Sequence, residues 1–505
     1  MTTFPVNAPL IPLAQAQGLE GCVLTYGHFS TIHPGHIRYL KHASKQGDRL
    51  VVALVGDGQA NQRTRYQFSQ QERAEGLMLL PMVDAVLLLA DDELPEAVSQ
   101  LQPGVLVLGK EFEHSPEPLI RKAIAEMRSA RKAVQFHAGD IHYASAELLS
   151  NSERELVDQR RNQFRLACRR QGLSLEGLLE DMQAWRHSNL IVLGDTIVDQ
   201  YAACEAVGMS AEAPVVVVRE LQKRNFIGGA AVVASHIRAL GAECQLLSVV
   251  GTDSTAELVR RELAEREIGD GLVSDPSRPT TFKKRYLVEN QKLFRVSRVE
   301  DHNLAAEIED QVIQQLERLA PLVDGVVVSD FVYGVVTPRI LQRLQRLAQD
   351  HKLLLFGDLQ CSSQVGSVTR FQHFSLLCPN EREARLALQD KDSGLEQLSQ
   401  QLLKSTGCER LVMKLGAEGF IAYDRNSAGQ TVNQLFPALS VNPLDVTGAG
   451  DSMLAVMATG LASGQAMMAT AALACCMASI AVETMGNTPI SSVALKSSIE
   501  ELLYT

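Results

Sequence analysis

A glycine-rich string near the end of the chain has the residue types that phosphoryl transfer needs. It runs Asp445-Val-Thr-Gly-Ala-Gly-Asp451 and precedes a helical pattern over 452–461. Glycines let the backbone approach a phosphate, and free N–H groups at a helix start present partial positive charge. The carboxylate of Asp451 could accept the proton of an attacking hydroxyl. The alternative is a helix cap without a ligand, but the full string favours function. The candidate catalytic residues are Asp451, Gly448, Ala449 and Gly450.

A second string, near the start of the chain, could bind a nucleoside triphosphate. It runs Gly27-His-Phe-Ser-Thr-Ile-His33-Pro-Gly-His36 and joins an apolar segment to a helical pattern over 36–46. Imidazoles at a helix N-terminus can donate to an α-phosphate, and positioning with charge stabilisation can carry the transfer. The alternative is that one histidine caps the helix and the other lies on the surface. His33 and His36 are the candidate catalytic residues, with Gly27 at the nucleotide.

The elements that must position the histidine string alternate between apolar segments and helical patterns. The apolar segments are 21–26, 50–55, 84–89 and 105–108. Fully apolar strands separated by helices predict a parallel sheet covered on both faces. We therefore predict an α/β domain with a Rossmann-like parallel sheet over 18–150.

A second α/β pattern begins at 189–193 and continues with apolar segments at 245–250, 325–329, 352–356 and 410–414. Two stretches of alternating polarity, 212–223 and 280–298, predict a small β-sheet that could act as a lid. The charged stretch 152–170 predicts an exposed helix, so we place a helical linker over 151–187 and a kinase domain over 188–505. Trp185, the only tryptophan, is expected to dock the two domains.

The string ending at Asp451 resembles the signature of the ribokinase-like (PfkB) carbohydrate kinases, and similarity extends from about residue 189 to the C-terminus. Gly194-Asp195 with Asp199, Gly228-Gly229, Pro379-Asn380 with Glu383, and Lys414 to Gly419 resemble further landmarks of that family. The resemblance implies ATP and Mg²⁺ as cofactors. The nucleotide-binding residues it implies are Thr447, Asp445, Asn380, Glu383, Lys414, Gly416 and Gly419, with Glu383 also at the metal. The sugar-binding residues it implies are Asp199, Gly228 and Gly229.

Other segments are similar to the heptose-7-phosphate kinase half of bifunctional heptose enzymes, which supply nucleotide-activated heptose for lipopolysaccharide. These segments are 210–214, Asn290-Gln291 with Arg295, and Ser329-Asp330-Phe331 with Gly334. This narrower resemblance adds Asn290, Arg295 and Asp330 to the expected substrate site.

The segment from about residue 18 to 150 resembles the cytidylyltransferase-like nucleotidyltransferases, and most closely the heptose-1-phosphate adenylyltransferase half of the same enzymes. Arg65 and Arg73 match basic positions of that family, and Gly109 matches its glycine turn. The resemblance implies that Arg73 contacts the nucleotide. In those enzymes the kinase comes first, whereas here the order is reversed. The choice between ATP and CTP at the transferase site stays open.

The chain differs from these families at residues of the expected sugar site and at residues of the transferase segment. On the sugar side of the kinase they are Val232, Ser297, Tyr333 and Gln360; in the transferase segment they are Ser30, Asn61, Leu108 and Ala144. One hypothesis is a bifunctional kinase and nucleotidylyltransferase. The alternative is a monofunctional kinase with an altered sugar substrate and a non-catalytic transferase-like domain. A third hypothesis, a scaffold protein in which both sites are inactive, conflicts with the complete glycine-rich string that ends at Asp451.

Composition narrows the remaining classes of function. The net charge of -11 with intermixed signs disfavours a nucleic-acid partner. The nine cysteines show no paired spacing, which indicates reduced thiols. Neither a signal peptide nor a membrane span is predicted, so we expect a cytoplasmic enzyme of small sugars or sugar phosphates and nucleoside triphosphates. The lid suggests a homodimer. The cations Arg278, Lys283, Lys284 and Arg285 are either a solvated face or a clamp on an anionic substrate.

Overall fold

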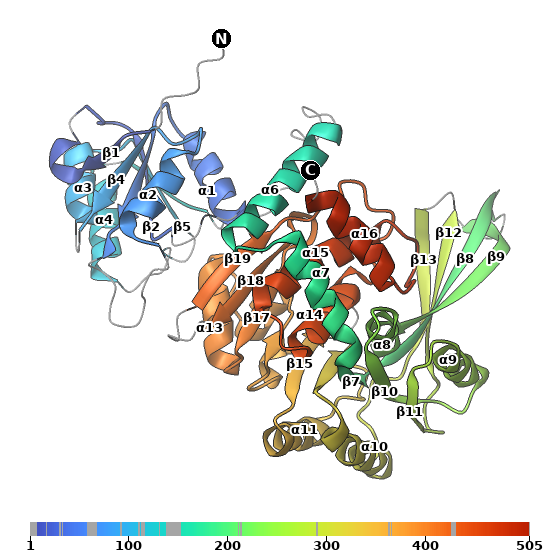
Figure 1. Cartoon of the computed structure of the whole chain (residues 1–505). Coiled ribbons are helices and arrows are strands. Elements are labelled where there is room, and N and C mark those ends of the chain that lie inside the picture. The colour runs from blue at the N-terminus through green and yellow to red at the C-terminus, as the bar shows by residue number, and fades with distance from the viewer. Residues whose placement is uncertain are drawn as a thin grey trace. The chain divides into compact units, whose positions relative to one another are not determined.

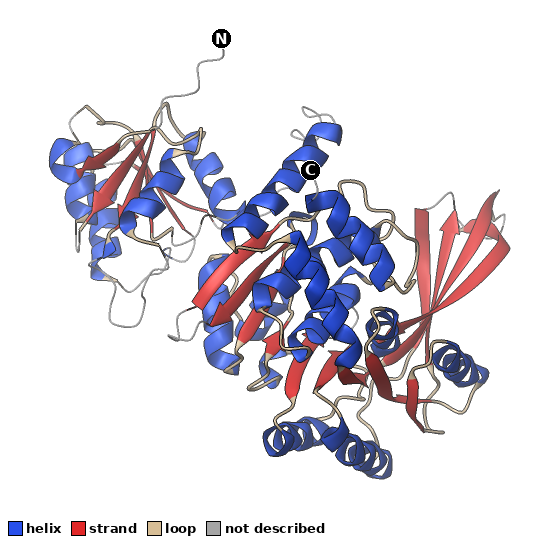
Figure 2. Cartoon of the chain, in the orientation of Figure 1, coloured by secondary structure: helices blue, strands red, loops and turns tan. Residues whose placement is uncertain are grey.

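The chain forms two units in its computed structural model (Figure 1). One unit comprises residues 1–147 with 388–401 and 425–433, and the other comprises the remaining segments. The structure describes residues 8–16, 18–29, 32, 34–57, 68–90, 93–109, 112, 117–130, 132–137, 153–210, 212, 215–288, 291–361, 364, 366–425 and 431–503. Figure 2 shows helices and strands alternating in both units, so the predicted α/β class is confirmed.

The first unit is built on a six-stranded sheet in which all neighbouring strands are parallel. In spatial order its strands are β1 (Leu10–Pro12), β4 (Ala85–Leu89), β3 (Leu50–Val55), β2 (Val23–Gly27), β5 (Val105–Gly109) and β6 (Ala133–His137). Its helices are α1 (Pro34–Ser44), α2 (Gln70–Met78), α3 (Leu94–Leu101) and α4 (Pro118–Ser129).

Strand β3 shows why this sheet is covered on both faces. Its residues Val51, Ala53 and Val55 pack in one apolar cluster with side chains of α3 and α4. The alternate residues of β3, such as Val52, pack in a second cluster with side chains of α1 and α2. Successive side chains of a strand point to opposite faces, so a continuous apolar run needs a helical layer on each side.

The strand order of the first unit also locates its binding edge. From β2 the chain proceeds to β3 and β4 on one side, and then places β5 and β6 on the other side. In open parallel sheets ligands bind beyond the carboxyl ends of the strands where the order reverses. Gly27 ends β2 and Gly109 ends β5, so both glycines lie at this switch point.

The second unit contains a nine-stranded sheet. In spatial order its strands are β11 (Gly269–Ser274), β10 (Glu243–Val250), β7 (Asn189–Gly194), β14 (Gly325–Asp330), β15 (Leu354–Leu359), β16 (Leu376–Leu377), β17 (Arg410–Lys414), β18 (Phe420–Arg425) and β19 (Thr431–Phe436). Pairing is parallel from β11 to β17, and β18 is antiparallel to β17. The order reverses between β7 and β14, so a second switch point lies where Gly194 and Asp330 end these strands.

Helices cover this sheet. They are α6 (Glu153–Arg170), α7 (Leu175–Ala184), α8 (Ala230–Ala239), α9 (Ser254–Glu265), α10 (Ala306–Leu319), α11 (Pro338–His351), α12 (Glu381–Leu388), α13 (Leu395–Thr406), α14 (Ala449–Ala462), α15 (Met467–Val482) and α16 (Ser492–Leu503). Helix α14 packs against α8 and α15 and against β7, β14 and β15, and almost all of its residues are buried. In the described part of the chain, every helix is too short or too polar to cross a membrane.

A separate four-stranded sheet projects from the second unit and forms the predicted lid (Figure 1). Its spatial order is β13 (Gln291–Arg298), β12 (Thr281–Val288), β8 (Thr196–Met209) and β9 (Val216–Gly229). The inner ends of β8 and β9 are buried and their outer ends are exposed. Strand β8 was not predicted, because its sequence is apolar in one half and mixed in the other.

The segment predicted as a linker contains helices that pack on the second unit. The ring centroids of Phe164 and Phe436 lie 6.4 Å apart, and Arg165 Nε donates to the carbonyl of Leu502 at 2.7 Å. Trp185 is fully buried, and its Nε1 donates to Gln465 Oε1 at 2.9 Å. The expectation that Trp185 docks one domain on the other is therefore corrected, because its polar partner belongs to its own unit.

This packing predicts where the chain can be cut. A fragment of residues 153–505 keeps α6 and α7, so it should fold and bind ATP. Its melting temperature should be close to that of the kinase part in the full-length protein. A fragment of residues 188–505 removes the buried Trp185 and Phe164, each costing about 3–5 kcal/mol when truncated in a core. It should be insoluble or melt far lower. Equal thermal stability of the two purified fragments would contradict the packing described here.

Candidate active site

Helix α14 begins inside the glycine-rich string, at Ala449. Gly448 caps the helix with φ of 84°, a left-handed conformation that glycine adopts without strain. A Cβ on Gly448 would also lie 2.7 Å from Asn487 Oδ1, so both backbone shape and space require glycine here. The first-turn N–H groups of α14 offer an anion site at the carboxyl edge of the sheet.

Asp451 in the first turn of α14 is buried and lies among charged groups. Its Oδ1 accepts a hydrogen bond from Gln360 Nε2 at 2.8 Å. Burial and the neighbouring carboxylates of Asp358 and Asp199 raise its pKa to about 7, against the opposing effects of Lys414 and Gln360. A carboxylate that titrates near neutrality can both accept and release a proton, as a general base must.

Lys414, at the end of β17, supplies the cation beside this carboxylate. Its Nζ lies 2.7 and 3.0 Å from the two carboxylate oxygens of Asp358. A Cβ on Gly450 would lie 3.5 Å from the same Nζ, so the ammonium borders the glycine loop. Although burial opposes its charge, Asp358 and Glu383 raise the pKa of Lys414, which keeps it protonated.

Glu383 and Asn380 form a reciprocal cap at the start of α12. The backbone N–H of Asn380 donates to Glu383 Oε2 at 2.8 Å, and the N–H of Glu383 donates to Asn380 Oδ1 at 2.8 Å. Burial raises the pKa of Glu383, with Asp358 adding to the effect and Lys414 opposing it. Glu383, Asp358 and Lys414 therefore form one electrostatic group, with two carboxylates and one ammonium.

Asp445, at the start of the glycine-rich string, is held by the lid. Tyr201 of β8 donates its hydroxyl to Asp445 Oδ2 at 2.8 Å, and Lys292 of β13 donates to Asp445 Oδ1 at 2.8 Å. The N–H of Thr447 donates to the same Oδ1 at 3.0 Å. Burial opposes ionisation of Asp445, but these donors outweigh it and lower its pKa to about 2.

The predicted sugar residues Asp199, Gly228 and Gly229 come together at the base of the lid. Asp199 Oδ1 is paired with Arg285, and Asp199 Oδ2 accepts from Asn487 Nδ2 at 3.2 Å. A Cβ on Gly228 would lie 2.6 Å from Asp199 Oδ2. Gly229 precedes α8 with φ of 61°, and a Cβ there would lie 2.2 Å from the carbonyl of Asp195. Both glycines allow α8 to begin directly beside Asp199.

Asp330 is bound to protein groups in this structure. It is buried, its Oδ2 accepts from Arg370 Nη1 at 3.0 Å, and its Oδ1 accepts from the N–H of Val332 at 2.8 Å. The nearby carboxylate of Asp195 accepts hydrogen bonds from three backbone N–H groups in the segment 331–335. These contacts fix the turn after β14, and the predicted contact of Asp330 with substrate stays a prediction.

Two of the remaining predicted kinase residues are glycines of one turn, and a third lies on the lid. Gly416 and Gly419 form the turn between β17 and β18, with φ of 59° and 98°. Arg295 is exposed on β13, opposite Arg285. Asn290 lies outside the described residues.

The four cations considered together in the sequence are directed at different partners. Arg278 is buried and donates to Asp275 and to two backbone carbonyls. Lys284 pairs with Glu220 at 2.5 Å, and Arg285 pairs with Asp199. Lys283 Nζ lies 5.3 and 5.1 Å from the ring centroids of Phe331 and Tyr333. They do not form a single clamp in this arrangement.

In the first unit the residues after β2 form the candidate nucleotide edge. Phe29 has φ of 44°, and a Cβ on Gly27 would lie 2.9 Å from the Phe29 ring. His36 is half-buried in α1, with its ring centroid 5.1 Å from that of Phe29. His33 and Arg65 lie outside the described residues.

Arg73 binds the strand ends of this edge. It is buried, and its Nη2 donates to the carbonyl of Val55 at 2.9 Å and to Asp57 Oδ1 at 2.8 Å. Its Nη1 donates to the carbonyl of His28 at 2.5 Å. Arg73 thus joins the segments after β2 and β3, and its predicted contact with the nucleotide stays a prediction.

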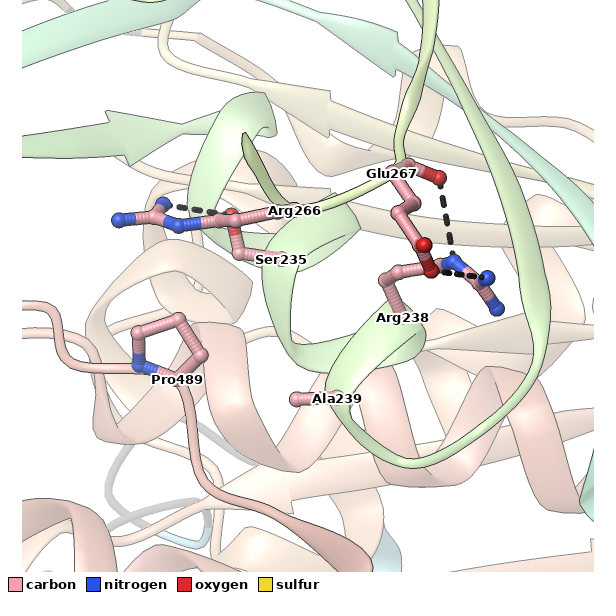
Figure 3. Close-up of a pocket in the computed structure, with 6 residues that line it drawn as sticks. All are labelled: Ser235, Arg238, Ala239, Arg266, Glu267 and Pro489. Atoms are coloured by element: carbon pink, nitrogen blue, oxygen red, sulfur yellow. Dashed lines mark hydrogen bonds and ion pairs between the residues drawn. The ribbon is translucent and has the colours of Figure 1, made fainter. Parts of the chain in front are cut away.

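A cavity of about 310 Å³ lies away from these sites, at the ends of α8 and α9 (Figure 3). Its lining residues are Ser235, Arg238, Ala239, Arg266, Glu267 and Pro489. The two guanidinium groups point in different directions, and they are held by Ser235 at 3.0 Å and by Glu267 at 2.9 Å. The predicted site residues are not part of this lining.

Sequence reasoning missed three residues that contact the site. Tyr201 and Lys292 come from lid strands, and Asn487 comes from the segment between α15 and α16. Lys292 lies one residue beyond the quoted pair Asn290-Gln291, so its place in that motif was the available signal. Tyr201 and Asn487 had no comparable signal, because only the folded chain brings them to Asp445 and Asp199.

The fold and the glycine loop define a phosphotransferase that uses the switch point of an α/β sheet and a lid. The model of the pfkB family carbohydrate kinases matches residues 187–493, and the cytidylyltransferase-like model matches residues 24–232. The chain belongs to the pfkB family of carbohydrate kinases. Membership implies ATP as phosphoryl donor and a small-molecule sugar as acceptor. The cytidylyltransferase-like match confirms the predicted class of the N-terminal fold.

Curated relatives carry the name Bifunctional protein HldE. The protein of Geobacter sulfurreducens is 31% identical over 316 residues, covering 62% of this chain and 63% of that protein. The protein of Campylobacter jejuni subsp. doylei is 28% identical over 311 residues, covering 61% of this chain and 64% of that protein. The matched part is therefore less than two thirds of each relative's length.

Among solved structures, phosphofructokinase-2 from Escherichia coli in complex with potassium superimposes with a TM-score of 0.52 at 18% identity. The match covers 62% of this chain and 99% of that one. At this identity the likeness establishes the fold of the kinase part alone.

The titration of Asp451 predicts the pH dependence of the kinase reaction. A general base must be ionised, so kcat/KM should fall about tenfold for each pH unit below its pKa. With that pKa at about 7, the acid limb should have its midpoint near neutrality. Gln360→Leu removes a hydrogen bond that favours the carboxylate and should move the midpoint to higher pH.

The control for this experiment is Gln345→Leu on α11, whose amide donates to the carbonyl of Gln372 away from Asp451. Its pH–rate profile should overlay that of the unmodified protein. A midpoint below about pH 5, or an identical midpoint in Gln360→Leu, would contradict this role of Gln360 and Asp451.

Proposed function

We propose that the chain is a bifunctional enzyme that phosphorylates a heptose phosphate with ATP and joins a sugar 1-phosphate to a nucleotide. The observation that carries the kinase part is a buried carboxylate titrating near neutrality, Asp451, in the first turn of a helix whose N-terminus is bordered by Lys414. The heptose assignment rests on the sequence resemblance at 210–214, 290–295 and 329–334. The relatives named Bifunctional protein HldE support it.

In the kinase step, Asp451 accepts the proton of the acceptor hydroxyl while that oxygen attacks the γ-phosphorus of ATP. The bond from phosphorus to the bridging oxygen breaks, and ADP leaves with the electron pair. The N–H groups of Gly448, Ala449 and Gly450 stabilise the charge on the transferring group. Lys414 adds a fixed positive charge beside the loop.

The carboxylates beside the glycine-rich loop are suitable ligands for the predicted Mg²⁺. Mg²⁺ prefers carboxylate oxygens, phosphate oxygens and water, and needs few protein ligands. Glu383 and Asp358 provide carboxylates beside Lys414, and the described residues contain no cluster of three or more metal-ligating side chains. We propose that Glu383 helps to hold the ion, which would neutralise phosphate charge during transfer.

In the second step, a phosphate oxygen of the sugar 1-phosphate would attack the α-phosphorus of a nucleoside triphosphate and release pyrophosphate. Support comes from the switch point of the first sheet, where Gly27 and Gly109 end neighbouring strands and His36 lies in the following helix. We propose that His33 and His36 stabilise the α-phosphate. The domain division that goes with these two steps is 18–150 for the transferase and 188–505 for the kinase, with the helices α6 and α7 of the predicted linker packed on the kinase part.

The alternative is a kinase with a changed sugar site. Val232 and Tyr333 are buried at positions where the heptose kinases carry polar or charged residues. Gln360 donates a hydrogen bond to the proposed general base, Asp451, so its amide is directed at that carboxylate rather than at a sugar phosphate. The predicted homodimer stays a prediction, supported by exposed apolar side chains of the lid such as Leu221 and Phe294. A single monomeric species in sedimentation velocity would contradict it.

A coupled assay with separate detection of ADP and pyrophosphate tests the proposed function. The protein should release ADP with heptose-7-phosphate at a kcat/KM above about 10⁴ M⁻¹s⁻¹, and pyrophosphate with heptose-1-phosphate and ATP. Unphosphorylated sugars of similar size serve as controls. Preference for an unphosphorylated sugar would contradict the heptose-phosphate assignment, and absence of pyrophosphate with both ATP and CTP would favour the monofunctional kinase.

A further inference from the structure

The glycine-rich loop is bonded to two different strands of the lid. Lys292 of β13 donates from Nζ to Asp445 Oδ1 at 2.8 Å and lies 3.3 Å from Thr447 Oγ1. Tyr201 of β8 donates to the other oxygen, Asp445 Oδ2, at 2.8 Å. Both oxygens of one carboxylate thus accept from lid side chains, although Tyr201 and Lys292 lie 244 and 153 residues before Asp445 in the sequence.

The same carboxylate also shapes the loop itself. Asp445 Oδ1 accepts from the N–H of Thr447 at 3.0 Å, so the lid ammonium and a loop N–H share one oxygen. Two residues after Asp445 the chain enters the segment Thr447–Gly450, whose N–H groups begin α14. A displacement of Asp445 would therefore change the loop from which the anion site is built.

Burial makes this contact sensitive to the position of the lid. The side chain of Asp445 is 2% exposed, whereas that of Lys292 is 43% exposed. Loss of the Lys292 ammonium removes a charge that stabilises the buried Asp445 carboxylate, although Tyr201 and the N–H of Thr447 still donate to it. If β13 moves away, Asp445 must either acquire water or change its position, and both outcomes disturb the loop.

Cation–π contacts with the Tyr201 ring link these groups within the lid. The Lys292 ammonium lies 5.8 Å from the centroid of the Tyr201 ring, and the guanidinium of Arg285 lies 5.3 Å from the same centroid. Arg285 also pairs with Asp199, one of the predicted sugar residues. The position of a group in the sugar site is thus linked to the loop through Tyr201 and Asp445.

We propose that Lys292 is a positioning residue of the kinase reaction, which locks the lid onto the phosphoryl-transfer loop through Asp445. The loop takes its anion-binding shape when β8 and β13 are both seated. This coupling favours transfer to a bound acceptor over transfer to water, because closure of a lid both completes the catalytic groups and excludes solvent. The inference rests on the proposed kinase reaction but not on the identity of the sugar.

The test compares Lys292→Met, which keeps an apolar stem and removes the charge, with Lys284→Met as a matched control. Lys284 lies on the neighbouring strand β12 and pairs with Glu220 within the lid, away from the loop. With heptose-7-phosphate as acceptor, Lys292→Met should lower kcat roughly a hundredfold, the scale of a small misplacement of catalytic groups. ATP affinity should stay unchanged, and Lys292→Arg should restore most of the rate.

Two further measurements separate positioning from general loss of structure. The ratio of ATP hydrolysis without acceptor to phosphoryl transfer should rise in Lys292→Met and stay constant in Lys284→Met. Hydrogen exchange in the peptide covering 444–453 should become faster in Lys292→Met alone, while β9 is unaffected. A double-mutant cycle with Asp445→Asn should show that the two substitutions act through one contact.

The inference is overturned if Lys292→Met keeps its kcat, or if both lysine variants lose rate and exchange protection alike. If the unmodified protein does not turn over heptose-7-phosphate, the proposed substrate fails. In that case hydrogen exchange at 444–453 still decides between a lid lock and an incidental contact.

Discussion

The site depends on a carboxylate buried at the N-terminus of a buried helix. Asp451 is in the first turn of α14, which packs over β7, β14 and β15, and its carboxylate accepts from Gln360, directly after the end of β15. Burial and two carboxylates make ionisation of Asp451 difficult, while the helix N-terminus beside it attracts anions. We propose that a substrate hydroxyl and a phosphoryl group bind at adjacent places here.

Charge balance around this helix explains how several elements act as one site. Asp358 raises the pKa of both Glu383 and Asp451, and the ammonium of Lys414 opposes this effect at both carboxyl groups. On the other side, the lid provides Lys292 and Arg285 for Asp445 and Asp199. The lid thus acts on the site through charge as well as through shape.

Much of the fold could be predicted because local pattern and global structure agree. The apolar segments predicted at 50–55 and 410–414 are β3 and β17, and the glycine-rich string begins a helix as expected. The strand predicted at 352–356 is β15 (Leu354–Leu359), since Lys352 ends α11 in a left-handed conformation. Contacts such as Tyr201 with Asp445 could not be predicted, because no local pattern encodes which distant strand reaches the loop.

The measurement that tests this account most directly is the rate of phosphoryl transfer in Asp451→Asn. The substitution keeps size and hydrogen bonding but removes the base. The account predicts that ADP release with acceptor falls by a factor on the order of a hundred or more, with ATP affinity close to that of the unmodified protein. Retention of most of the turnover would contradict the assignment of Asp451 and of the kinase site built around it.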